Sequence, residues 1–83
     1  MKTITSTYYG ATNTRGSRVV ARDEDGHRAV VRWESDLSDT ANHDEAARAL
    51  CARMKWSGHD LVRGATKRGY VYVFNSPAER VTL

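Results

Sequence analysis

The side chains in this sequence that are capable of acid–base or metal chemistry belong to ten acids, three histidines and one cysteine. The acids gather at positions 23–25 and 34–39, next to turn-forming residues, where carboxylates commonly accept backbone N–H groups and keep the surface soluble. General acid–base catalysis instead requires a carboxylate whose pKa is perturbed inside a pocket. We therefore predict no catalytic role for these acids.

The histidines and the cysteine give no pattern of metal binding or nucleophilic catalysis. His27, His43 and His59 have no metal-ligand spacing with one another or with Cys51. Cys51 lies within an apolar helical pattern, which predicts a buried and unreactive thiol. The sequence predicts no metal, no cofactor and no enzymatic activity.

Four arginines on two neighbouring segments suggest a binding surface. They are Arg18, Arg22, Arg28 and Arg32. If the two segments form a β-hairpin with a three-residue loop, Arg22 lies opposite Arg28 and Arg18 opposite Arg32, with Val20 and Val30 exposed between them. Like charges opposed across strands are destabilising, so this face is expected to bind a negatively charged partner. The alternative is that nearby acids such as Asp23 and Glu34 neutralise the arginines, which then only maintain solubility.

Two further basic residues, Lys67 and Arg68, lie in the segment Gly64–Gly69 and complete the predicted partner-binding set. This segment lacks the full phosphate-loop pattern and precedes a strand rather than a helix, so a basic hairpin loop is predicted. Four tyrosines could stack on bases, which keeps nucleic-acid binding as an alternative function. They are Tyr8, Tyr9, Tyr70 and Tyr72. Aromatic residues at alternate strand positions are, however, also typical of packing.

The elements that would position these residues begin with a strand at Thr3–Tyr9, rich in β-branched and aromatic residues, whose alternation of Ile4, Ser6 and Tyr8 with threonines suits an edge or near-edge position. A loop at Gly10–Gly16 follows, and then a hairpin of Ser17–Asp23 and His27–Trp33. A two-residue Asp-Gly turn would pair Val20 with Val31. A three-residue loop with a left-handed Gly26 would pair Val19 with Val31 and Ala21 with Ala29, and is preferred because it places the charges on one face.

The second half of the chain predicts one helix and two strands. Asn42 is the expected N-cap of a helix that runs to about Trp56 and stops at Gly58. Its buried stripe comprises Ala46, Ala47, Leu50, Cys51 and Met54. Strands are expected at Asp60–Arg63 and Tyr70–Phe74, the second in a central position, and Ala78–Leu83 is expected to form a short edge segment or to be mobile.

The order β-β-β-α-β-β predicts an α+β fold, in which an antiparallel sheet carries one helix on one face. The predicted common core comprises Leu50, Cys51, Met54, Val31, Trp33, Val71 and Val73. A length of 83 residues predicts a single domain, residues 1–83, and 40% hydrophobic with 28% charged residues is ordinary for a globular protein. Thirteen Lys and Arg against ten Asp and Glu give a net charge of +3, which favours acidic partners only weakly.

The expected location is the cytoplasm. The N-terminal residues have no apolar stretch typical of a secretory signal, and no run approaches the roughly 20 apolar residues needed to span a bilayer. The single cysteine allows no internal disulfide, which agrees with a reducing compartment.

From Asp25 onward the chain resembles small proteins encoded by phages and prophages of Gram-negative bacteria, among them an anti-CRISPR inhibitor of type I surveillance complexes. The resemblance is one of pattern along the chain. Its residues are Asp25-Gly26, Val30-Val31, Ser38-Asp39, the alanine-rich helix ending in Met54-Lys55-Trp56, Val62, Gly64, Lys67, Val73-Phe74, Pro77 and Val81.

The resemblance implies a stoichiometric inhibitor that occupies a surface of a Cas protein and has no catalytic residues. A basic face differs from an acidic mimic of DNA, so the arginines would contact acidic protein side chains or a guide-RNA backbone. The leading expectation is thus a phage-type accessory protein whose partner is a host defence protein or complex. The alternatives are a nucleic-acid-binding module and a structural or assembly protein of a mobile element.

Overall fold

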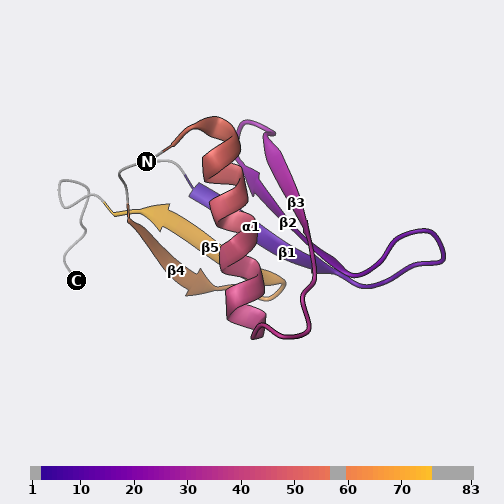
Figure 1. The fold of residues 1–83 in the computed structure, drawn as a ribbon. Coiled ribbons are helices and arrows are strands. Elements are labelled where there is room, and N and C mark those ends of the chain that lie inside the picture. Colours follow the sequence, from indigo (N-terminus) through magenta and orange to yellow (C-terminus); the bar gives the residue numbers. More distant parts are fainter. Residues whose placement is uncertain (1–2, 57–59, 76–83) are drawn as a thin grey trace.

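The computed structural model describes residues 3–56 and 60–75, which form an α+β fold (Figure 1). The elements, in order, are β1 (Thr3–Tyr9), β2 (Arg18–Asp23), β3 (Arg28–Arg32), α1 (Asp39–Met54), β4 (Leu61–Ala65) and β5 (Gly69–Phe74). This order confirms the predicted β-β-β-α-β-β succession. The predictions for Gly58, His59 and Ala78–Leu83 fall outside the described residues.

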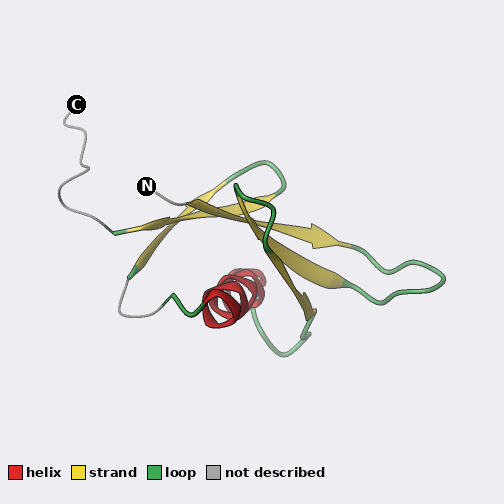
Figure 2. Ribbon diagram, turned by 90° about the horizontal axis from the view of Figure 1, so that it is seen from above, coloured by secondary structure: helices red, strands yellow, loops and turns green. Residues whose placement is uncertain are grey.

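The five strands form one antiparallel sheet in the order β3-β2-β1-β5-β4, and α1 packs against β1, β2 and β3. Figure 2 shows the helix on one side of the sheet only. β1 lies at the centre, so its predicted edge or near-edge position is wrong. The threonines of β1 lie on the sheet face that no described element covers. Polar residues on this strand therefore indicate an exposed face and not an edge position.

The core lies between the sheet and α1, and its central side chains are fully buried. Ile4, Val19, Ala21, Ala46 and Leu50 each have 0% exposure. The core also takes in the predicted residues Cys51, Met54, Val31 and Trp33, which are partly buried.

Two residues predicted for this core, Val71 and Val73, belong to the opposite face of the sheet. The pairing of Ile4 with Tyr72 puts the β5 aromatics on the helix side, since side chains alternate along a strand. Tyr70, Tyr72 and Phe74 therefore pack with the core instead of the two valines. A continuous apolar strand does not indicate by itself which set of side chains faces the helix.

The β2–β3 hairpin has the preferred register, with Val19 opposite Val31 and Ala21 opposite Ala29. The loop between Asp23 and His27 contains three residues and is closed by a hydrogen bond of 3.0 Å from the Asp23 N–H to the His27 carbonyl. Gly26 has the expected positive φ of 92°. Most other residues are strained in this conformation, whereas glycine lacks a Cβ and adopts it readily.

The helix begins earlier than predicted, because Ser38 and not Asn42 is its N-cap. The Ser38 hydroxyl accepts a hydrogen bond of 3.1 Å from the Ala41 N–H. The Asn42 side chain instead joins the helix to the preceding loop, since its Oδ1 accepts from the Glu34 N–H and its Nδ2 donates to the Glu34 carbonyl. A short polar side chain near a helix start can serve either role, and tertiary contacts decide between them.

The helix ends at Met54, two residues before the predicted end. Lys55 adopts the left-handed conformation with φ 60°. Its N–H donates to the Ala52 carbonyl, and the Trp56 N–H donates to the Cys51 carbonyl. These two bonds form a Schellman motif whose left-handed position is occupied by lysine instead of the usual glycine.

β4 and β5 are joined by a shorter turn than predicted. Gly64 and Ala65 belong to β4 and Gly69 to β5, so that the turn comprises 66–68. β5 lies inside the sheet between β1 and β4, as its apolar sequence indicated. No helix among the described residues is long and apolar enough to cross a membrane.

Candidate binding face

The four predicted arginines lie on the sheet face opposite α1. We call them the arginine face: Arg18 and Arg22 of β2, and Arg28 and Arg32 of β3. The register places Arg18 opposite Arg32 and Arg22 opposite Arg28, as the sequence predicted. Their alternation with Val19 and Ala21, which are fully buried under the helix, fixes their position on the other face.

None of these four arginines has a carboxylate partner among residues 3–56 and 60–75. Asp23 faces the helix side, and its carboxylate accepts hydrogen bonds from the hairpin-loop residues Asp25 and His27. Glu24 accepts from Thr3. Neither Asp23 nor Glu34, the acids expected to neutralise the arginines, forms a hydrogen bond or ion pair with any of the four among the described residues.

The Asp23 carboxylate is bound within the hairpin loop. Burial tends to raise its pKa, but the hydrogen bonds from His27 and Asp25 outweigh that effect and lower the pKa. Asp23, Asp25 and His27 bring possible ligand atoms within 4.8 Å of one another. The Asp23 carboxylate already bonds the His27 ring and the backbone N–H groups of Asp25 and His27, so the group is explained as turn chemistry.

Tyr9 joins the two β2 arginines. The Tyr9 hydroxyl accepts a hydrogen bond of 3.0 Å from Arg22 Nη1, and the guanidinium carbons of Arg18 and Arg22 lie 5.2 and 5.7 Å from the ring centroid. The hydrogen bond from Arg22 is the largest cause of a lowered pKa of Tyr9, and the positive charges add to it. The ring thus holds two guanidinium groups close together through hydrogen-bond and cation–π contacts.

Tyr9 was predicted only as one of four tyrosines that could stack on bases and not as part of the partner-binding set, although the alternation of β1 places it on the same face as Thr3, Thr5 and Thr7. The pairing of β1 with β2 identifies Tyr9 as part of this face, since Tyr9 lies directly opposite Arg18.

The prediction that Val20 is exposed is wrong, because Val20 is only 4% accessible. Val20 lies between Arg18 and Arg22 on the face where both arginines contact the Tyr9 ring. Val30 is exposed, as predicted.

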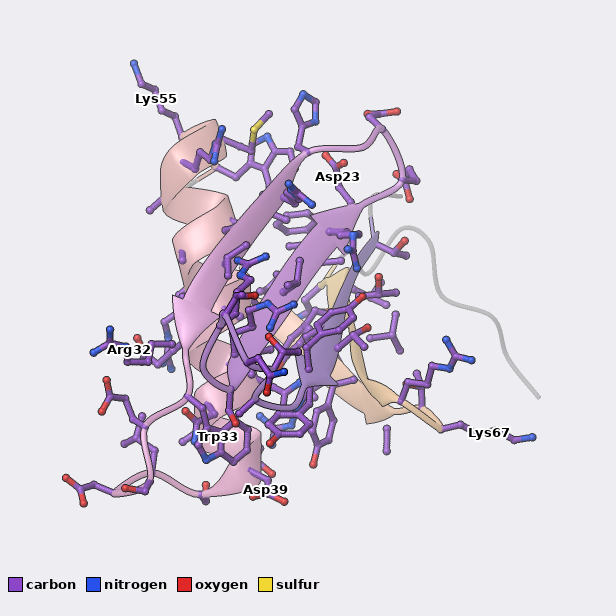
Figure 3. All side chains as sticks on the ribbon, turned by 90° about the vertical axis from the view of Figure 1, so that its right-hand side faces the viewer. Asp23, Arg32, Trp33, Asp39, Lys55 and Lys67 are labelled. Atoms are coloured by element: carbon purple, nitrogen blue, oxygen red, sulfur yellow. The ribbon has the colours of Figure 1, made fainter. Side chains whose placement is uncertain are left out.

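The β4–β5 turn contributes one of its two basic residues to this region. Arg68 is near enough to Tyr9 for its charge to lower the pKa of that hydroxyl. Lys67 extends outward from the turn, on the other side of the view in Figure 3 from Arg32. The predicted set therefore divides into the arginine face with Arg68 nearby and a separate Lys67.

The other three tyrosines lie on the helix side and do not offer a base-stacking platform beside the arginines. Tyr8 packs edge-on against Trp33, with ring centroids 4.9 Å apart. The Tyr72 hydroxyl donates a hydrogen bond of 2.7 Å to Asp44. Burial is the largest cause of a raised Tyr72 pKa, and this hydrogen bond is the second. Asp44 also receives two hydrogen bonds of 2.8 Å from Arg63, which ties α1 to β4.

Two side chains that could take part in acid–base chemistry, those of Ser6 and His43, are buried inside the fold. The His43 Nδ1 lies 2.6 Å from the Ser6 hydroxyl, and both residues are buried. Burial lowers the pKa of His43, although the charges of Asp39 and Asp44 oppose this effect, and so favours the neutral ring. This pair lies between the sheet and α1, on the side away from the arginine face.

Cys51 is half-buried, not fully buried as predicted, and lines a groove of about 560 Å³ between α1 and the β4–β5 strands. Burial raises the pKa of its thiol, which disfavours the reactive thiolate. Among the described residues, no acid or histidine is bonded to this thiol. Its surroundings resemble a packing site more than a nucleophilic centre.

Comparison of the chain with protein-family models, with curated proteins and with solved structures found no match. The site must therefore be interpreted from its own geometry.

Proposed function

We propose that this chain is a small non-enzymatic binding protein whose arginine face holds an acidic surface of a partner. One observation carries the proposal: four arginines lie together on the sheet face that no described element covers, and none has a carboxylate partner among the described residues. Opposed like charges reduce the stability of the free sheet. Carboxylates supplied by a partner would convert this repulsion into bidentate ion pairs.

Tyr9 supports this use of the face because it reduces the freedom of two of the arginines before binding. Each long side chain that a partner immobilises costs about 0.5–1.5 kcal/mol of conformational entropy. Arg18 and Arg22 already share contacts with the Tyr9 ring. A partner would therefore meet two arginines that are partly ordered.

The resemblance to phage and prophage proteins provides the candidate partner. We propose that it is a Cas protein of a type I surveillance complex, which the chain would inhibit by stoichiometric binding in the cytoplasm of the host cell. A basic face suits an acidic protein surface or the guide-RNA backbone of such a complex. It does not suit mimicry of DNA, which would require a negative surface.

Free nucleic acid is the second candidate, and the presence of Arg68 near Tyr9 supports it. Two guanidinium groups, however, already contact the ring of Tyr9, the one tyrosine on this face among the described residues. A single engaged ring is a poor platform for successive bases, which single-strand binders stack on several aromatic residues. We therefore place a protein partner first.

The test is binding of the full chain to a purified type I surveillance complex, before and after nuclease treatment, with the variants Arg18→Ala, Arg22→Ala, Arg28→Ala and Arg32→Ala. Protein docking predicts that one or two variants lose about 2 kcal/mol or more while the others lose little. Arg53→Ala, an exposed helix arginine away from this face, is the matched control. Phosphate binding instead predicts a similar loss in all four variants and a steep fall with salt. Unchanged affinity in all four would rule out the arginine face as a binding site.

A further inference from the structure

The sheet face opposite α1, which no described element covers, continues past the arginines into an aliphatic area on β4 and β5. This valine patch comprises Val62, Val71 and Val73 on the side away from α1, where Val62 of β4 pairs with Val73 of β5 and Val71 lies two residues before Val73 on the same strand. Val62 is 57% exposed, and the other two are partly exposed. Two of the three are the residues that sequence patterning assigned to the core, and the register has brought them to the surface.

The valine patch and the arginine face are parts of one continuous surface. Arg28 pairs with Arg22, Arg22 with Thr5, and Thr5 with Val71, so one row of side chains crosses the sheet from charge to aliphatic groups. Neighbouring strands lie about 4.8 Å apart, which puts the backbones of Arg22 and Val71 about 10 Å apart. Thr5 lies between them as the transition.

No described charged residue of β4 or β5 interrupts the patch. Gly64, opposite Val71, has no side chain, and a Cβ at this position would only touch Val71 at 3.6 Å. Because side chains alternate along β4, Arg63 lies on the helix side, where it donates hydrogen bonds to Asp44. The patch is therefore aliphatic from Val71 to Val62.

We infer that the partner of this face is a protein surface on which carboxylates lie about 10 Å from aliphatic side chains. The inference rests on the proposed function and narrows it to a class of partner. A nucleic acid carries closely spaced phosphates, one charge per roughly 1.7 Å of duplex axis, and offers no aliphatic surface of this kind. Protein interfaces combine an apolar centre with polar and charged groups around it.

The test uses two synthetic peptides and NMR titration of the isotope-labelled full chain. The first peptide has two glutamates, two glycines and two leucines in that order, and the second has serines in place of the leucines. The last glutamate and first leucine are three residues apart, which spans about 10 Å in an extended chain. Both peptides carry the same charge, so a difference in affinity reports the aliphatic contact.

We expect the leucine peptide to bind at least fivefold more tightly than the serine peptide and to shift amide signals of β4 and β5. The double variant Val62→Thr with Val71→Thr preserves β-branching and should reduce the difference to less than twofold, with unchanged affinity for the serine peptide. Val62→Thr alone, at a position 57% exposed, should act in the same direction without affecting folding. A 12-base-pair DNA duplex should bind the double variant and the unchanged chain equally.

Equal affinity for the two peptides, or absence of binding by the leucine peptide, would overturn the inference. So would an equal loss of duplex and peptide binding in the double variant. The double variant Arg22→Ala with Arg28→Ala separates this result from the proposed function. If it weakens both peptides alike, the acidic-partner proposal stands whatever the valines do, and if it weakens neither, that proposal fails.

Discussion

At the scale of single residues, the buried polar side chains are engaged by their own chain, whereas the exposed arginine face has no carboxylate partner among the described residues. Asn42 forms hydrogen bonds with the loop before the helix, His43 with Ser6, and Asp23 with the hairpin loop. Among the described residues, each buried side-chain N or O has a hydrogen-bond partner. Unsatisfied potential is thus confined to the surface, where a partner can reach it.

Gly69 shows how closely one residue can be constrained by its neighbours. A Cβ built there would lie 2.0 Å from the Ser6 carbonyl oxygen and 3.0 Å from the His43 ring. We expect Gly69→Ala to lower the free energy of unfolding by about 1–3 kcal/mol or more, because backbone of β1 would have to shift. Urea unfolding measures this, with Gly16→Ala as control, since nothing lies within 4 Å of a Cβ at Gly16. Equal stability of the two variants would disprove the close approach.

At the scale of elements, the end of α1 carries a removable strain. Lys55 adopts φ 60° to complete the Schellman motif, and a left-handed conformation costs roughly 1–2 kcal/mol in a residue with a Cβ. We predict that Lys55→Gly raises the free energy of unfolding by about 0.5–1 kcal/mol, whereas Lys55→Ala gives no gain. Thermal unfolding of both variants checks this. A Lys55→Gly protein no more stable than Lys55→Ala would contradict the left-handed cap.

At the scale of the whole molecule, one helix covers one face of a five-stranded sheet, so mutations on the two faces should differ in effect. Leu50 is 0% exposed in the core, and Leu50→Ala should cost about 2–5 kcal/mol through lost burial and cavity formation. Val62 is 57% exposed on the other face, so Val62→Ala should change stability by about 0.5 kcal/mol or less. Urea unfolding of both variants tests this asymmetry. Similar costs would mean that the uncovered face is packed and unable to bind a partner.

The sequence by itself determined the elements and the first hairpin. Gly26 allowed either a two-residue turn or a three-residue loop, and the alternation of Val19 and Ala21 with arginines favoured the three-residue loop, its register and hence the arginine face. These features depend on residues close in sequence, where turn chemistry and a period of two are sufficient.

Only the tertiary structure decided which elements lie side by side and which faces are covered. β1 is central because it pairs with β2 on one side and with β5, about 65 residues later, on the other. That pairing turned Tyr72 toward the helix and Val71 toward the surface, and it placed Tyr9 among the arginines. Local patterning cannot choose between two apolar faces of a strand, because the choice is made by the free energy of packing against residues distant in the chain.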